Sequence, residues 1–288
     1  MNNGAISLAE MLERKQGLLK SRNRLMRPPT PSKRTEVWYR DRLIEFIRLM
    51  QDVVIEDLQK PILNDAPFES VLSITARLSR AIQKLANMSI LDMARRLSFG
   101  MVRRANDQNK SQTQKTYKAA FGIDLTGMLG DGTVKEHLEN AVRENIDLIQ
   151  SIQTDFINDI GERVFANLTN GGRHENLVSL IRERGNVSQS RAKFIARDQT
   201  AKLNSALTEA RSKALGLDLY EWGGAGDERE RASHFVLNGK TCKYSDPTVY
   251  SDDGGKTWKK RKSIGGFEGN PGEDHQCRCV SLPKVSWD

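Results

Sequence analysis

Aromatic side chains and long apolar runs are both scarce in this sequence. Phe, Trp and Tyr make up 6% of its 288 residues, and hydrophobic types together make up 38%, against 28% charged. No stretch approaches the ~20 apolar residues that span a bilayer, and the N-terminus lacks a basic-then-apolar secretory pattern. We therefore expect no membrane partner, synthesis in a cytoplasm, and long solvated helices.

Cysteine is scarce too, and the count is odd. The three cysteines are Cys242, Cys277 and Cys279, and the last two form a Cys-x-Cys pair. An odd, clustered set argues against a disulfide framework and favours reduced thiols. Catalytic motifs are missing as well: the sequence has no paired-carboxylate metal triad, glycine-rich phosphate loop or nucleophile elbow.

Acidic residues are outnumbered by basic ones, and the formal net charge is +8. Such a balance favours an anionic partner, for which double-stranded DNA is the first candidate, because neutralising phosphates releases counterions. A solubility role for the charge stays open. Residues 1–34 form a basic arm broken by prolines at 28, 29 and 31, which we expect to be flexible. Arg22 and Arg24 in this arm are candidate DNA contacts.

The next 180 residues have helical periodicity. We expect helices over residues 35–60, 67–102 and 133–168, a short helix over 174–184, and a further helix from Ser188 to a terminating Gly216. Residues 105–132 are polar and then glycine-rich, which indicates a looser segment and a boundary. The predicted domains are a helical domain over 35–130, long helices over 131–216, and a small module over 217–288.

After Gly216 the periodicity changes from helical to alternating. Residues 217–222 and 279–282 read as strands, and 249–258 as a hairpin, because Asp253-Gly254-Gly255 supplies the positive φ angles that a tight turn requires. The fold class is therefore α+β and mostly α: a body of long helices followed by a small C-terminal α+β module.

The module also contains the most distinctive residue pattern in the chain. Its elements are Arg231-x-x-His234, Asn238-Gly239, Asp246-Pro247 and His275-x-Cys277-Arg278-Cys279, with Asp227 just upstream. Together with the preceding helix, this pattern resembles the signature of the phage Mu F-like minor head proteins, the phage head morphogenesis family. Members often have proline between the final His and Cys, where this chain has Gln276, and an Asp-Gly turn at Asn238-Gly239.

The resemblance implies a minor capsid protein of a tailed phage, assembled in the bacterial cytoplasm and incorporated into the head near the portal. It implies partners among the portal, major capsid and scaffold proteins. From the residues, Arg231 and His234 are expected to tie loops to strand ends, and Asn238-Gly239 and Asp246-Pro247 to form turns.

Metal binding is a second interpretation of the same pattern. Cys242, His275, Cys277 and Cys279 are candidate ligands, with His234 as another, because thiolate and imidazole suit Zn²⁺. Side chains two apart on a strand share one face, so a Cys-x-Cys pair permits chelation without requiring it. A buried thiol pair beside a hydrogen-bonded histidine is the alternative.

DNA contact is expected at one further place, where basic residues surround an aromatic ring. They are Lys256, Trp258, Lys259, Lys260, Arg261 and Lys262. Basic residues beside an indole suit sequence-independent phosphate binding. Two other functions stay open: an enzyme that uses His234, Arg231 and His275 on phosphate esters, and a free DNA-binding accessory protein.

Overall fold

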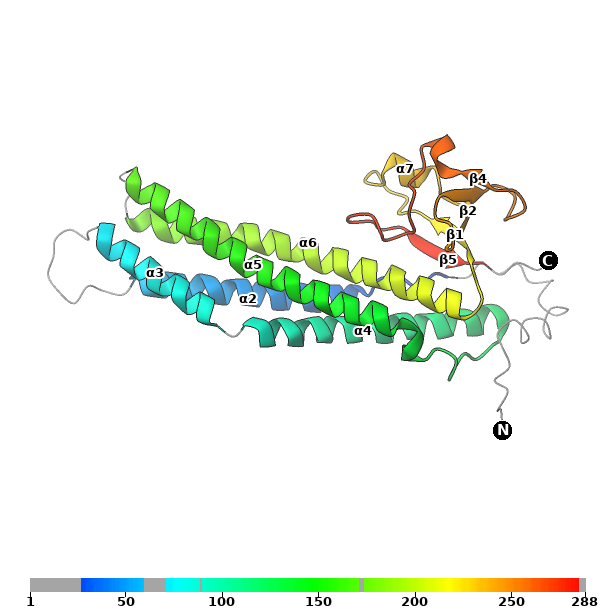
Figure 1. Cartoon of the computed structure of the whole chain (residues 1–288), viewed down its shortest axis with the longest axis horizontal. Helices are drawn as coiled ribbons and strands as arrows, with labels where there is room; N and C mark the ends of the chain where they lie inside the picture. The colour runs from blue at the N-terminus through cyan, green and yellow to red at the C-terminus, as the bar shows by residue number, and fades with distance from the viewer. Residues whose placement is uncertain (1–26, 60–70, 89, 171–173, 285–288) are drawn as a thin grey trace. The chain divides into compact units, whose positions relative to one another are not determined.

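The computed structural model describes residues 27–59, 71–88, 90–170 and 174–284. Arg22 and Arg24 lie outside them. The elements are α2 (Lys33–Gln59), α3 (Val71–Asn87), α4 (Ile90–Phe121), η1 (Asp131–Val134), α5 (Lys135–Thr169), α6 (His174–Ala214), β1 (Leu219–Gly223), α7 (Ala232–Phe235), β2 (Thr241–Lys243), β3 (Val249–Ser251), β4 (Lys259–Lys260), η2 (Arg261–Ile264) and β5 (Val280–Pro283) (Figure 1). Long helices followed by a small sheet confirm the predicted α+β, mostly α class.

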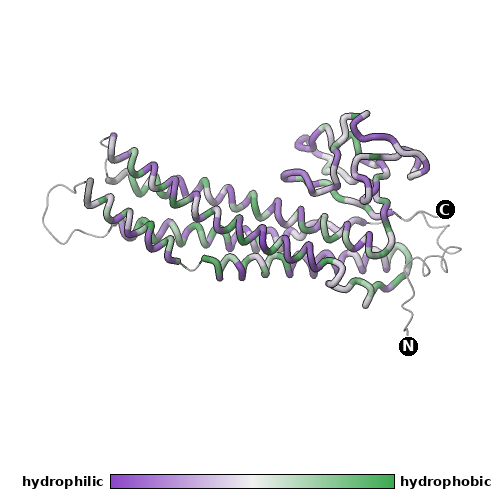
Figure 2. Tube along the Cα trace, viewed as in Figure 1, coloured by the Kyte–Doolittle hydropathy of each residue, from purple (hydrophilic) through white to green (hydrophobic). Residues whose placement is uncertain are grey.

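The chain divides into two compact units. One comprises residues 36–100 and 142–197, and the other 1–35, 101–141 and 198–288. The described residues of the first are helical apart from Met88 and Asn170. Its buried apolar side chains recur every three or four residues. Figure 2 shows hydrophobic and hydrophilic residues interspersed along these helices, in green and purple. They include Leu43, Ile47, Met50, Val54 and Leu58 of α2, Ile149, Ile152, Phe156 and Ile160 of α5, and Leu177 and Ile181 of α6.

Polar contacts tie the helices of this unit together. The Tyr39 hydroxyl donates to Asn145 Oδ1 at 2.9 Å, and Gln51 Nε2 donates to the Ile181 carbonyl at 3.3 Å. Gln51 reaches α6 beside Gly185, where a Cβ atom would lie only 1.8 Å from Gln51 Nε2. Gly185 therefore serves close packing, and α6 runs through it without a break. The predicted division into two helices around Ser188 is wrong.

Helix α4 corrects a second expectation. The segment 105–121, predicted to be loose, is helical, and the helix predicted over 67–102 is instead α3 followed by the start of α4. Asn106, Asn109 and Thr113 are polar but buried, at spacings that place them on one helix face. Arg211 of α6 donates to Asn106 and Asn109, both at 2.5 Å. A buried polar seam therefore replaces the apolar stripe that sequence patterning looks for.

The second unit has two cores. The first joins the end of α4 to the chain after α6 and contains Tyr117, Ile123, Leu125, Leu129, Leu215 and Leu217. Helix α6 ends at Ala214, and Gly216 follows in the turn after it. Gly216 has φ of 79° and its N–H donates to the Lys213 carbonyl at 2.9 Å, as predicted for a terminating glycine. The chain then enters the sheet.

The sheet has strand order β4-β3-β2-β1-β5, and all neighbours are antiparallel. The strands predicted at 217–222 and 279–282 are confirmed as β1 and β5. The hairpin predicted over 249–258 forms from β3 and β4, but its second strand begins one residue beyond that range. Buried residues of the second core are Tyr220, Trp222, Leu237, Cys242, Tyr244, Tyr250, Cys277 and Cys279. Strand β1, which lies between β2 and β5, alternates half-buried and buried side chains, which places Tyr220 and Trp222 in this core.

Candidate functional site

The buried histidine of the module, His234, is positioned by the short helix α7. This helix has four residues, and the N–H groups of His234 and Phe235 both donate to the Arg231 carbonyl at 2.9 Å. The turn directs His234 inward, where it is 2% exposed, and leaves Phe235 63% exposed. The imidazole lies edge-on to Trp222 and beside Phe267, with ring centroids 5.7 and 4.9 Å away.

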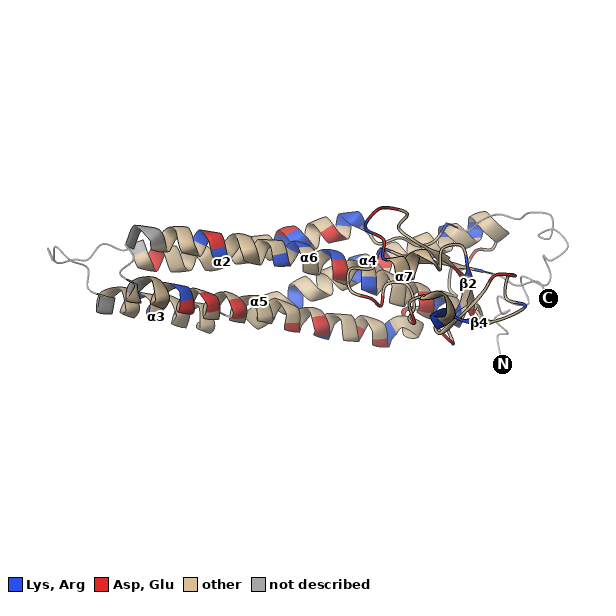
Figure 3. Cartoon of the chain, turned by 90° about the horizontal axis from the view of Figure 1, so that it is seen from above, with Lys and Arg blue, Asp and Glu red and all other residues tan. Residues whose placement is uncertain are grey.

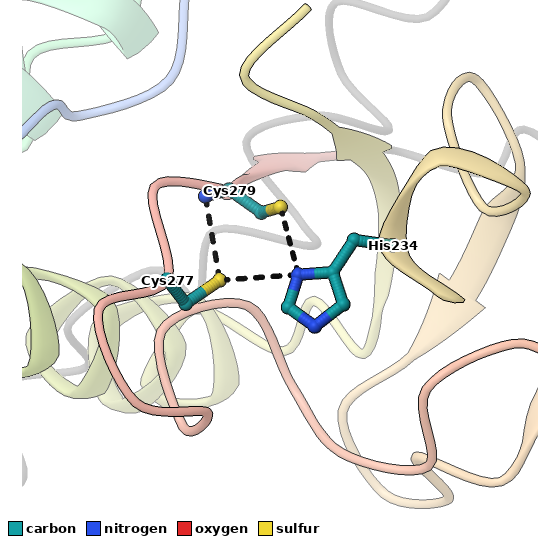
Figure 4. Close-up of side chains that lie close together, drawn as sticks. All are labelled: His234, Cys277 and Cys279. Atoms are coloured by element: carbon teal, nitrogen blue, oxygen red, sulfur yellow. Dashed lines mark hydrogen bonds between the residues drawn. The ribbon is translucent and has the colours of Figure 1, made fainter. Parts of the chain in front are cut away.

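The two cysteines of the Cys-x-Cys pair approach the same histidine. Both are 4% exposed, while Arg278 between them forms a bidentate ion pair with Asp227. Cys279 Sγ lies 3.4 Å and Cys277 Sγ 3.6 Å from His234 Nδ1, as Figure 4 shows. The three ligand atoms lie within 4.8 Å of one another. We call His234, Cys277 and Cys279 the His–Cys group.

The other ring nitrogen of His234 has a separate partner. His234 Nε2 lies 3.1 Å from Asp274 Oδ2, and the same carboxylate oxygen lies 3.2 Å from Arg231 Nη1. Arg231 Nη2 also donates to the His275 carbonyl at 2.7 Å. Because a carboxylate accepts hydrogen bonds, the neutral imidazole donates from Nε2 to Asp274 and keeps a lone pair on Nδ1, toward the sulfurs.

Hydrogen bonding and burial shift the protonation of the group. A hydrogen bond from Cys279, followed in importance by the contact with His234, lowers the pKa of the Cys277 thiol despite its burial. The neighbouring Cys277 sulfur and burial raise the pKa of Cys279. The hydrogen bond with Cys277 raises the pKa of His234, against the effect of burial. Of the two thiols, Cys277 is therefore the more readily deprotonated.

The remaining candidate metal ligands lie elsewhere in the described structure. Cys242 is fully buried on β2, and its Sγ lies 3.8 Å from the Lys240 carbonyl. The His275 side chain is 62% exposed, and its Nδ1 lies 3.8 Å from Asp198 Oδ1. The structure therefore brings together Cys277, Cys279 and His234, and does not add Cys242 or His275 to them.

The comparisons with known proteins cover this region. The family model described as "Phage Mu protein F like protein" matches residues 158–282, which include the whole His–Cys group. We call residues 158–282 the Mu F-like segment, because they match this family model. No solved structure matches the chain.

One similar protein is described only as an uncharacterized protein from Haemophilus influenzae. It is 32% identical over 269 residues, which is 92% of this chain and 56% of the relative. The chain thus spans little more than half of that relative's length. Within the described residues, none of the helices has the length and apolar character needed to span a membrane.

Two turns of the Mu F-like segment form where its dipeptides predicted them. Gly239 has φ of 73° and its N–H donates to the Trp222 carbonyl at 2.9 Å, which connects the Asn238-Gly239 turn to β1. Asp246 Oδ1 accepts from the Thr248 hydroxyl at 2.6 Å and the Thr248 N–H at 3.1 Å, with Pro247 between them. Both dipeptides shape the chain around the sheet.

Only some residues of the predicted basic cluster around Trp258 are exposed. Arg261 is fully buried, so its assignment to a DNA-binding surface is wrong. Lys243 Nζ covers the Trp258 ring at 4.0 Å, and Lys259 pairs with Asp252 at 3.1 Å. Lys256, Lys260 and Lys262 are exposed. Figure 3 shows basic and acidic residues interspersed along the helices as well.

Buried Arg261 organises the second core. Its Nε donates to the Val249 carbonyl at 2.9 Å, its Nη1 to Gly269 at 2.6 Å, and its Nη2 to the Tyr220 hydroxyl at 3.0 Å. Its guanidinium carbon lies 5.3 Å from the Trp222 ring centroid. The sequence did not reveal that Arg261 is a buried donor or that Asp274 is the partner of His234. Arg261 stands in a run of basic residues and Asp274 in a loop, and neither setting indicates a structural contact.

Proposed function

We propose that this chain is a phage head morphogenesis protein, a minor capsid component that joins the head near the portal as a structural adaptor. The observation that carries the proposal is the Mu F-like match over residues 158–282, which covers the end of α5, α6 and nearly the whole sheet module. The long helices offer extended surfaces for portal, capsid or scaffold subunits.

The burial of the His–Cys group supports a structural role over the enzymatic alternative. A general base must come within hydrogen-bond reach of its substrate, and His234 is 2% exposed with both ring nitrogens close to protein groups. Arg231 likewise forms an ion pair with Asp274 and donates a hydrogen bond to the His275 carbonyl. These contacts hold loops together.

The direct test is the protein content of phage heads. Heads purified from cells that produce the phage encoding this chain should contain it at a low, fixed ratio to portal subunits, by quantitative mass spectrometry. Deletion of the gene should reduce the yield of infectious particles. Absence of the chain from heads, with normal head assembly and genome delivery after deletion, would refute the proposal.

Contact with packaged DNA is part of the same proposal, and Lys256 and Lys262 represent the exposed lysines of the predicted cluster in its test. The replacement of both by alanine should weaken binding to double-stranded DNA and lower the salt-dependence slope of log K by about 2, since each phosphate contact contributes about 0.9. Lys193→Ala, at an exposed position of α6, is the matched control. An unchanged slope would remove this surface from the proposal.

A further inference from the structure

The geometry of the His–Cys group matches a metal centre. In a tetrahedral zinc site, ligand bonds of ~2.0–2.3 Å place a nitrogen and a sulfur ligand roughly 3.5 Å apart. The His234 Nδ1 to Sγ distances are 3.4 Å for Cys279 and 3.6 Å for Cys277. Both sulfurs approach the same nitrogen, which has a single lone pair and can fully accept only one S–H hydrogen bond.

We propose that His234, Cys277 and Cys279 bind one Zn²⁺ ion, which fastens α7 to the segment that enters β5. Two thiolates and a neutral imidazole balance the charge of a divalent cation, so the buried centre is neutral overall. The described residues supply three protein ligands, which would leave the fourth position of the tetrahedron to water. Cys277 and Cys279 are close in sequence, whereas His234 is more than 40 residues away, so the ion would cross-link two distant segments of a loop-rich module.

The surroundings of the group support a metal in three further ways. Asp274 accepts from His234 Nε2, which fixes the tautomer whose Nδ1 can bind metal, an arrangement typical of zinc-bound histidine. The Cys279 N–H lies 3.4 Å from Cys277 Sγ and donates to it, as backbone N–H groups do to metal-bound thiolates. The buried indole N–H of Trp222 lies beside Cys279 and has no other acceptor among the described side chains and backbone.

The experiment uses the full chain, free of any polyhistidine tag and purified without chelators in a non-thiol reductant. Zinc is counted per chain by mass spectrometry of the metal, and cobalt is titrated into metal-free protein. We expect about one zinc per chain, and a cobalt spectrum with thiolate-to-metal charge-transfer bands. Cys277→Ser and Cys279→Ser should each lose the zinc and weaken those bands.

Two control variants separate this site from adventitious binding. Cys242→Ser removes the other buried thiol, and His275→Gln removes the histidine next to Cys277 in sequence, so both should keep the zinc. Asp274→Asn tests the positioning role of this carboxylate and should weaken zinc affinity by about 10- to 100-fold. Zinc retained equally by Cys277→Ser would overturn the proposal.

A readout on the unmodified chain keeps the test valid if the cysteine variants fail to fold. Zinc added to metal-free protein should slow alkylation of Cys277 and Cys279, mapped by peptide mass spectrometry, and leave that of Cys242 unchanged. It should also raise the melting temperature, since a ligand that binds the folded state stabilises it. Metal-free protein that takes up neither zinc nor cobalt, and whose thiols react equally with and without zinc, would overturn the proposal.

Discussion

The backbone N–H of Gln276 donates to Asp198 Oδ1 at 2.7 Å, which ties the turn before Cys277 to helix α6. Asp198 is 5% exposed, and its Oδ2 pairs with Lys202 at 3.0 Å. Gln276 is the one non-glycine residue with positive φ, 55°, in the described part of the chain. Proline, which often occupies this position in the family that the signature resembles, can adopt neither this φ nor this hydrogen bond.

Substitution of Gln276 tests that relationship. Gln276→Pro should lower the free energy of unfolding by about 3 kcal/mol or more, because it changes φ and removes the donor to buried Asp198. Gln276→Gly should leave stability unchanged or raise it by up to about 1 kcal/mol, because glycine adopts positive φ without strain. Urea unfolding followed by tryptophan fluorescence measures both. Equal stability of the two variants would contradict the role assigned to this residue.

Arg261 is the second test of the module. Arg261→Met preserves much of the side-chain volume but leaves the carbonyls of Val249 and Gly269 and the Tyr220 hydroxyl without their donor. We expect a loss of about 3 kcal/mol or more, because each unsatisfied buried group costs about 1–3 kcal/mol. Exposed Lys262→Met, at the next position, should change stability by less than about 0.5 kcal/mol. Similar effects of the two substitutions in urea unfolding would refute the buried role.

Gly216 offers a test of backbone conformation alone. Gly216 has φ of 79°, and a Cβ atom there would meet no atom within 4 Å, so Gly216→Ala adds strain without a clash. The expected loss is about 1 kcal/mol. Gly132→Ala is the matched control, because Gly132 has no positive φ and is equally open. Thermal unfolding should show Gly132→Ala unchanged or slightly stabilised; a loss equal to that of Gly216→Ala would argue against strain as the cause.

We expect the stability of the fold to depend on pH through Asp253, in the β3–β4 turn. Asp253 accepts hydrogen bonds from the Ser251 hydroxyl at 2.6 Å, the Thr257 hydroxyl at 2.6 Å and the Thr257 N–H at 2.9 Å. These hydrogen bonds lower the pKa of Asp253 well below its ordinary value, and the bond from Ser251 contributes most. A carboxylate whose pKa is lower in the folded state stabilises the fold above its unfolded pKa of about 3.9, and loses that effect as pH falls toward the folded pKa.

Asp253→Asn should therefore lower the melting temperature at neutral pH, and the difference from the unmodified chain should shrink below about pH 4. Exposed Glu268→Gln on the following loop is the control, and its melting temperature should stay close to that of the unmodified chain at neutral pH. A difference between Asp253→Asn and the unmodified chain that stays constant from pH 7 to pH 3 would show that the charge of Asp253 is not the cause.

Local features of this protein could be predicted from its sequence because they depend on near neighbours. Helices α2 and α5, the glycine at the end of α6, strands β1 and β5 and the β3–β4 hairpin follow from periodicity and turn residues. The pattern also identified the segment that contains the His–Cys group. The predicted domain boundaries, the DNA contacts other than Arg261, and the portal, capsid and scaffold partners stay predictions.

Only the tertiary structure decided which of these residues meet. His234 and Cys279 are 45 positions apart, and the path of the chain through the sheet, rather than spacing, brings them together and leaves Cys242 out. Packing likewise buried Arg261 among carbonyls, and Arg211 of a distant helix satisfies the buried side chains of Asn106 and Asn109 in the helical segment 106–114. Sequence periodicity indicates on which face of its helix or strand a side chain lies. Whether that side chain is buried, and which residues it contacts, depends on residues far along the chain.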